Sequence, residues 1–192
     1  MTVGRRLMAL LAALTLLIWA AAMAPVILRW VGVCFMPAAD APPVAYGNVA
    51  LGAGGVLGAL AFVPMMLGLS PSGQRARVGL GMLLALAFGV MITVFSAYMA
   101  LVVTVPMLHA AIRGEAVALP FRVDNPRDHV SRRGHCRHAI SVEAASFLFD
   151  NVCGVPDSLR EGLQRGQVVT LHGSGSAWGV FYSGVSRRAE RP

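Results

Sequence analysis

Three cysteines are the side chains of this 192-residue sequence whose chemistry depends most on where the chain places them. Cys136 and Cys153 lie in the polar C-terminal part, and Cys34 follows the first apolar segment. Two thiols in one small domain form a lasting disulfide where the compartment is oxidising. We predict a bridge between Cys136 and Cys153. Cys34 is then the odd thiol, either buried near the membrane or paired between chains.

A zinc site is the first alternative use of these residues. His135, Cys136 and His138, with Cys153 or His172, supply the imidazole and thiolate groups that zinc prefers. The spacing is poor, because His135 and Cys136 are adjacent and would point to opposite faces of a strand. Several neighbouring arginines would also repel a cation. We therefore predict no metal site and no cofactor.

A catalytic nucleophile is the second alternative. Cys136 or Cys153 would need a histidine and an acid such as Asp150. A chain of this length offers such triples by chance, and it contains no Gly-x-Ser-x-Gly, phosphate-loop, His-Glu-x-x-His or Cys-x-x-Cys motif. We expect no enzymatic activity. A membrane-bound thiol-redox protein or enzyme that uses these two cysteines is the alternative.

Four arginines are concentrated in one segment of the C-terminal part: Arg127, Arg132, Arg133 and Arg137. They are a candidate site for an anion, such as a lipid head group, or for an acidic protein partner. A solvated loop is the more frequent meaning of such a run, and Asp124 and Asp128 partly neutralise it. The net charge of +7 is spread over the whole chain, so we expect no nucleic-acid partner.

The composition shows which elements must position these residues. Hydrophobic residues make up 56% of the chain and charged residues only 13%, about half of what an ordinary soluble domain carries. Six of the 25 charged residues fall in residues 1–112 and the other 19 in the last 80. We predict a transmembrane region over 1–112 and an extramembrane domain over 113–192.

Three charge-free runs are each long enough to cross a bilayer, which takes roughly 20 helical residues. We place transmembrane helices at about 7–28, 46–69 and 78–103. The first run also resembles a signal peptide, because Arg5-Arg6 precedes it and Ala22-Met23-Ala24 has the form of a cleavage site. Its length favours a retained helix, and cleavage would leave the final topology unchanged.

Arginines near the ends of the runs predict the orientation, because positive charge is retained in the cytoplasm. Arg5 and Arg6 precede the first run, and Arg75 and Arg77 separate the second from the third. All 16 basic residues are arginine, and with many Gly and Ala this is typical of a GC-rich bacterial genome. We predict a multi-pass protein of the bacterial inner membrane, with a cytoplasmic N-terminus and a periplasmic C-terminal domain.

Small residues recur within the predicted helices at four-residue spacing, which lets two backbones approach closely in lipid. The residues are Gly54 and Gly58 in the second helix and Gly81, Ala85 and Gly89 in the third. We expect these rows to pack the two helices of one chain together, and a homo-oligomer interface is the alternative. No Asp, Glu, Lys or Arg falls inside a predicted span, which argues against an ion or proton pathway.

The C-terminal part has the short β-prone runs and Gly-rich turns of a small β-rich, barrel-like domain. We predict five strands near 119–123, 138–143, 147–149, 167–172 and 178–185, with a hairpin turn at Gly173–Ser176. A capping box from Ser158 to Glu161 predicts a short helix before the fourth strand. This order fits an OB-type barrel. An irregular sandwich or an SH3-like barrel fits almost as well.

These features favour a protein that acts by binding. We expect an inner-membrane accessory or assembly subunit, whose partners are the lipid bilayer and another envelope protein bound through the periplasmic β domain. An immunity-type inhibitor of a secreted toxin is the alternative within the same class.

Overall fold

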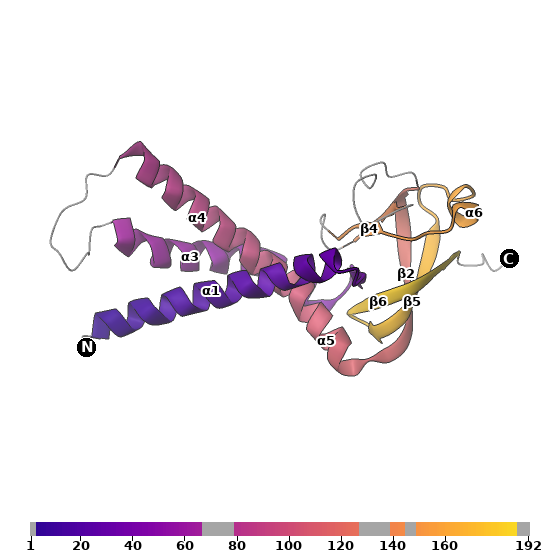
Figure 1. The fold of residues 1–192 in the computed structure, drawn as a ribbon, viewed down its shortest axis with the longest axis horizontal. Coiled ribbons are helices and arrows are strands. Elements are labelled where there is room, and N and C mark those ends of the chain that lie inside the picture. The colour runs from indigo at the N-terminus through magenta and orange to yellow at the C-terminus, as the bar shows by residue number, and fades with distance from the viewer. Residues whose placement is uncertain (1–2, 67–78, 127–138, 145–148, 188–192) are drawn as a thin grey trace. The chain divides into compact units, whose positions relative to one another are not determined.

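The computed structural model of this chain describes residues 3–66, 79–126, 139–144 and 149–187 (Figure 1). The chain forms two compact units, each built from two stretches of sequence. The helical unit comprises Met1–Met23 and Tyr46–Leu101, and the sheet unit comprises Ala24–Ala45 and Val102–Pro192. The sheet unit contains the range 113–192 that we predict for the extramembrane domain. It also includes residues 24–45 and 102–112.

The helical unit contains most of α1 (Val3–Trp30), with α3 (Gly47–Met66) and α4 (Leu80–Met99). Two helical stretches are long and apolar enough to cross a membrane, Ala9–Trp30 and Leu83–Arg113. Among the residues searched, α3 contributes a shorter apolar stretch, Gly47–Leu60, which is below the length that this test requires, so the predicted span at 46–69 is not confirmed. Residues 67–69 of that span lie outside the described residues.

Close backbone contact holds α3 against α4. A Cβ atom added to Gly54 would lie 2.8 Å from Cβ of Ala97 and 2.9 Å from Cα of Val94. At Gly58 the added atom would lie 3.2 Å from Cα of Val90. Helices approach this closely only where the side chain is a hydrogen atom, and such packing stabilises helix pairs in lipid.

A polar contact joins α1 to α4 within the helical unit. The indole Nε1 of Trp19 donates to Oγ1 of Thr93 over 3.3 Å, and Thr93 itself donates to the carbonyl of Gly89 over 2.9 Å. Thr93 is fully buried. The buried hydroxyl of Thr93 and the half-buried indole of Trp19 satisfy each other in this way, because a polar group inside an apolar bundle is costly unless it is hydrogen-bonded.

The helix that begins with α4 does not end at residue 103, where we predicted its end. It passes through one π-helical turn, η1 (Ala100–Thr104), into α5 (Val105–Arg113). Pro106 lies just after this π-helical turn, and because proline has no N–H to donate, the helical ladder is interrupted at the same place as the turn. Gly114 ends α5 with a left-handed backbone (φ 60°), which costs glycine little.

The sheet unit is a nearly closed, antiparallel, barrel-like sheet of six strands in the order β1-β6-β5-β2-β3-β4. The strands are β1 (Phe35–Pro37), β2 (Glu115–Asn125), β3 (Ile140–Val142), β4 (Asn151–Val152), β5 (Val168–Ser176) and β6 (Gly179–Arg187). Short helices α2 (Pro42–Ala45) and α6 (Asp157–Arg160) connect them. The predicted barrel-like β domain is confirmed at this level.

Three local predictions differ from the structure. A sixth strand, β1, comes from the loop after the first helix and pairs Phe35 with Phe181 of β6. The hairpin turn lies at residues 177–178, and the predicted turn Gly173–Ser176 is part of β5. Gly173 and Gly175 are needed there because a Cβ atom would collide with the backbone of β6. The short helix begins after Pro156 without a side-chain cap, so the predicted capping box does not form.

The third predicted strand, 147–149, lies partly outside the described residues, and the strand observed next is β4 at Asn151–Val152.

Aliphatic side chains that alternate along the strands fill the barrel. Those buried to 2% exposure or less are Met36, Val123, Ile140, Val142, Val152, Val155, Val169, Leu171 and Val180. The interior is therefore a packed hydrophobic core.

Candidate functional site

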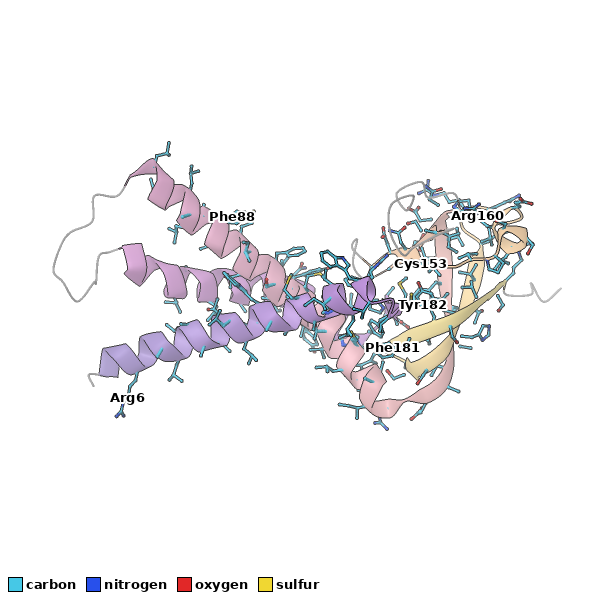
Figure 2. All side chains as sticks on the ribbon, viewed as in Figure 1. Arg6, Phe88, Cys153, Arg160, Phe181 and Tyr182 are labelled. Carbon is cyan, nitrogen blue, oxygen red and sulfur yellow. The ribbon has the colours of Figure 1, made fainter. Side chains whose placement is uncertain are left out.

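Among the described residues, the sheet order leaves a gap between the two end strands, β1 and β4, which do not pair with each other, and polar groups bridge it. We call this gap the barrel seam and define it by Arg29, Cys34, Asn151, Cys153 and Tyr182. The hydroxyl of Tyr182 accepts a hydrogen bond of 2.9 Å from the backbone N–H of Cys153 (Figure 2). The backbone N–H of Tyr182 donates to the carbonyl of Cys34 over 3.1 Å. Tyr182 therefore ties β6 to the residue just before β1 and to the residue just after β4.

Burial raises the pKa of Tyr182 well above its usual value. The hydrogen bond from Cys153 acts in the opposite direction and lowers the pKa, and the neighbouring thiol of Cys34 raises it further. The phenol therefore stays protonated at any physiological pH, with both its donor and its acceptor function in use. A group in this state is a structural tie and not a general base.

Arg29 provides the second bridge across the barrel seam. Its guanidinium donates to the carbonyl of Asn151 over 3.4 Å and lies over the ring of Phe149, 5.4 Å from the ring centroid. The side-chain amide of Asn151 donates to Oδ1 of Asp150 over 2.7 Å. One arginine thus holds two residues of the segment that carries β4, which is too short to be anchored by its ladder alone.

A second polar cluster fixes α5 to the β5–β6 hairpin. Nδ1 of His109 lies 2.9 Å from Oγ of Ser176, and the imidazole stacks on the indole of Trp178 with centroids 3.9 Å apart. The backbone N–H of Trp178 also donates to Oγ of Ser176. Ser176 is 5% exposed, so its hydroxyl is closed to a substrate. This serine–histidine pair therefore fits a structural role better than a nucleophilic one.

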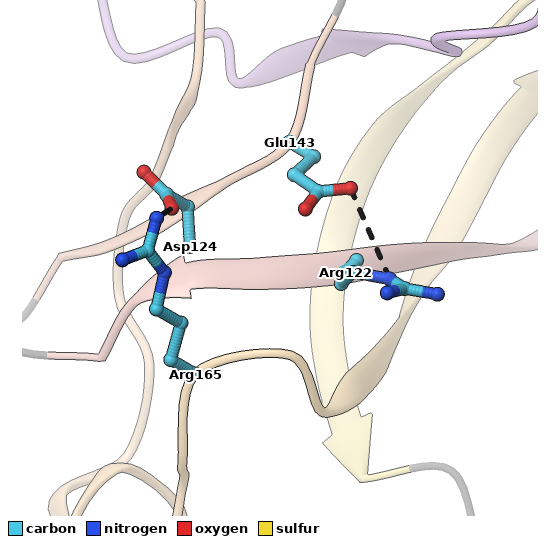
Figure 3. Close-up of polar contacts among 4 residues, drawn as sticks. All are labelled: Arg122, Asp124, Glu143 and Arg165. Atoms are coloured by element: carbon cyan, nitrogen blue, oxygen red, sulfur yellow. Dashed lines mark hydrogen bonds and ion pairs between the residues drawn. The ribbon is translucent and has the colours of Figure 1, made fainter.

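Exposed charges gather on the outside of the sheet unit around β2 (Figure 3). We call this set the β2 charge surface: Arg122, Asp124, Glu143 and Arg165. Arg165 donates to Oδ1 of Asp124 over 2.7 Å, and Nε of Arg122 lies 3.9 Å from Oε2 of Glu143. The four side chains are 45 to 80% exposed. Exposed pairs of this kind contribute about 0–1 kcal/mol to stability, so they can exchange partners at little cost.

The predicted site residues fall into three groups. Gly54 and Gly58 lie against α4, as described above, and Gly89 is buried, while Gly81 and Ala85 are exposed. Cys153 lies in the barrel seam. Cys136 lies outside the described residues, as do His135 and His138 of the zinc alternative, so the disulfide stays a prediction.

The four arginines proposed for anion binding also lie outside the described residues: Arg127, Arg132, Arg133 and Arg137. Among the residues that the structure describes, no group of three His, Cys, Asp or Glu side chains is arranged to hold a metal ion. His172, the remaining member of the zinc alternative, is exposed on β5, where its Nε2 lies 2.7 Å from Oγ of Ser186.

Sequence reasoning missed the residues that organise both clusters. From the sequence, we assign no role to Arg29 or His109, and we treat Cys34 only as the odd thiol. A signal was present, since Phe35-Met36-Pro37 is a short apolar run just beyond a helix, but three residues are too few to predict a strand. Tyr182 was placed on the correct strand without a role.

Searches of family models, curated proteins and solved structures gave no match to this chain.

Proposed function

We propose that this chain is a multi-pass protein of the bacterial inner membrane and acts by binding an envelope protein through its sheet unit. Three helices, at about 7–28, 46–69 and 78–103, would cross the bilayer. The N-terminus would face the cytoplasm and the sheet unit the periplasm. The described part of the chain supports this proposal in two ways, one for each unit.

The observation that carries the proposal is the distribution of exposed side chains. Large apolar side chains are exposed along the helical unit: Leu10, Leu14, Leu16, Leu17, Val49, Val56, Leu60, Leu83, Leu84, Phe88 and Met91. A soluble monomer rarely exposes a continuous apolar area of this size. Lipid is the solvent in which such a surface is stable, because hydrocarbon chains are as apolar as leucine.

The β2 charge surface supports the binding role of the sheet unit. Its charges are exposed, are of both signs, and form the pairs Arg122–Glu143 and Arg165–Asp124. Complementary charges on a partner can replace these pairs, which gives specificity and fast association more than affinity. The strand order β6-β5-β2-β3-β4, with a short helix after β4, also supports an OB-type barrel, a fold that commonly binds its ligands on strands and loops.

The topology can be tested by fusion of reporters to the full chain. A reporter that is active only after export is expected to work when fused after residue 112 and to fail when inserted near Gly73. Activity of a cytoplasm-dependent reporter at the C-terminus would overturn both the orientation and the predicted disulfide, because the compartment would then be reducing.

Partner binding can be tested by a photo-crosslinking amino acid placed in the full chain at position 122, 143 or 165. We expect one discrete heterologous adduct from these positions in intact cells, and its loss when Asp124 is changed to Arg. Ser183, which is exposed on β6, is the matched control position. The β2 charge surface would be rejected as the binding site if position 183 gave as much adduct as the test positions. It would also be rejected if none of the three test positions gave an adduct.

A further inference from the structure

The helix α5 presents an apolar face that the sheet unit does not cover. Val105, Leu108 and Ile112 follow each other at intervals of three and four residues, so they share one side of the helix. Their exposed fractions are 38%, 54% and 84%. The opposite side packs on the sheet, where Met107 and Ala110 are buried.

The inner side of α5 is fastened to the sheet unit. His109 lies on the flank of the helix between the two sides, where it is half-buried, pairs with Ser176 and stacks on Trp178. The outer apolar face therefore belongs to the sheet unit and has a fixed place on it. The contacts of His109 hold α5 on the sheet, so its outer apolar face stays on the surface of this unit.

The length of the continuous helix indicates what covers this face. The apolar stretch Leu83–Arg113 contains 31 residues, about 46 Å at 1.5 Å per residue, whereas the hydrocarbon core is about 30 Å thick. Its last residues must therefore lie at or beyond the membrane boundary. The π-helical turn η1 and Pro106 lie where the surplus begins, and both features commonly mark a change in helix direction.

A second exposed apolar site occurs on the sheet unit where the chain enters it from α1. Trp30 is 75% exposed and Val31 is 70% exposed. Tryptophan is enriched where the apolar core of a bilayer meets its head groups. Both segments that join the sheet unit to the apolar helices thus carry exposed apolar side chains at their junctions.

We propose that the outer face of α5, with Trp30, binds the interfacial region of the lipid bilayer and seats the sheet unit on the membrane surface. This inference depends on the membrane location proposed above but not on the partner protein. The occupant is lipid because the face continues an apolar helix whose other exposed side chains are also apolar, among them Leu84 and Phe88. A water-facing position would leave Ile112 hydrated at the end of that helix.

The test is spin labelling of the full chain in liposomes of phosphatidylethanolamine and phosphatidylglycerol. Single cysteines replace Trp30, Leu108 or Ile112 in a Cys34→Ser background, and the background protein without a new cysteine measures labelling of the remaining thiols. Collisions with oxygen, which dissolves in lipid, are compared with collisions with a water-soluble nickel chelate. Leu84→Cys serves as the reference inside the proposed span, and Ser158→Cys on α6 serves as the reference in water.

We expect oxygen collisions to exceed nickel collisions at positions 30, 108 and 112, as at position 84, and the ratio to invert at position 158. Nickel access at 108 and 112 equal to that at 158, with position 84 still in lipid, would overturn this inference and leave the membrane location intact. Nickel access at position 84 as well would overturn both. Exclusion of both reagents at 108 and 112 would show that protein, such as a second copy, covers the face, and would also overturn the inference.

Discussion

The two units of this protein differ in where their large apolar side chains lie: on the outside of the helical unit and in the interior of the sheet unit. In the helical unit, the closest contact is made by Gly54 and Gly58, and large side chains such as Phe88 are exposed. In the sheet unit, valine, isoleucine and leucine fill the interior, and the charged side chains are outside. Glycine contacts hold helices together where the solvent is apolar, whereas aliphatic burial holds a sheet together in water. This contrast is what we expect if lipid surrounds the helical unit and water surrounds the sheet unit, as proposed above.

The largest expected effect is the difference in stability between two Phe→Ala variants, one in each unit. Phe35 is buried beside Phe181, with ring centroids 4.9 Å apart, so Phe35→Ala should destabilise the sheet unit by about 3–5 kcal/mol. Phe88→Ala removes an equally large ring that is 60% exposed in the helical unit, and it should leave the sheet unit unchanged. Limited proteolysis of the detergent-solubilised full chain measures both. Equal protection of the two variants would contradict a structural role for β1.

A smaller effect is expected when the same Gly→Leu substitution is made at two positions of α3. Gly54→Leu would force a side chain into the backbone of α4 and should destabilise the helical unit by about 1–3 kcal/mol or more. Gly52→Leu is the matched control, because nothing lies within 4 Å of a Cβ atom at that position. Thermal unfolding in detergent, followed by size-exclusion chromatography, compares the two. If both variants keep the wild-type transition, the α3–α4 contact does not govern the stability of this unit.

A pH-dependent effect is expected in the sheet unit from Tyr182. The pKa of Tyr182 is raised in the folded protein, so the unfolded chain loses this proton first as the pH rises above about 10. Stability contributed by the protonated phenol is complete below that pH and falls above it, by at most about 1.4 kcal/mol per pH unit for one proton. The chain contains no lysine, which would titrate in the same range.

Tyr182→Phe should remove this alkaline decline. The same variant should be less stable than wild type near neutral pH by about 1–3 kcal/mol, because the backbone N–H of Cys153 loses its acceptor. Tyr46→Phe changes an exposed tyrosine and should preserve the decline. Denaturation curves between pH 7 and pH 11 measure both effects, and an unchanged slope in Tyr182→Phe would assign the decline to another group.

The smallest effect concerns the β2 charge surface. Glu143→Gln removes an ion pair whose two side chains are more than 60% exposed, so the stability of the sheet unit should change by less than about 0.5 kcal/mol. The same substitution should weaken the proposed partner adduct. A large loss of stability would make this surface structural and remove the argument for its use in binding.

The sequence predicted those parts of the fold that local patterns determine. Long apolar runs indicated the helices, and alternating residues indicated β5 and β6, because both signals repeat within a few residues. It did not predict β1, since Phe35-Met36-Pro37 becomes a strand only through pairing with Gly179–Phe181. The barrel seam was missed for the same reason. Arg29, Asn151 and Tyr182 meet only after the sheet has curled, and no local pattern records that contact.

The pairing of β1 with β6 has a consequence for biosynthesis. Phe35 leaves the ribosome roughly 145 residues before its partner Phe181, which at about 5–20 residues per second is a delay of about seven to thirty seconds. The first strand of the barrel is therefore delivered before α3 and α4 are made, and the last strand only after both. Throughout this interval β1 is an unpaired edge. Its length of three residues and its terminal proline, which cannot donate to a neighbouring chain, keep that edge a poor template for aggregation.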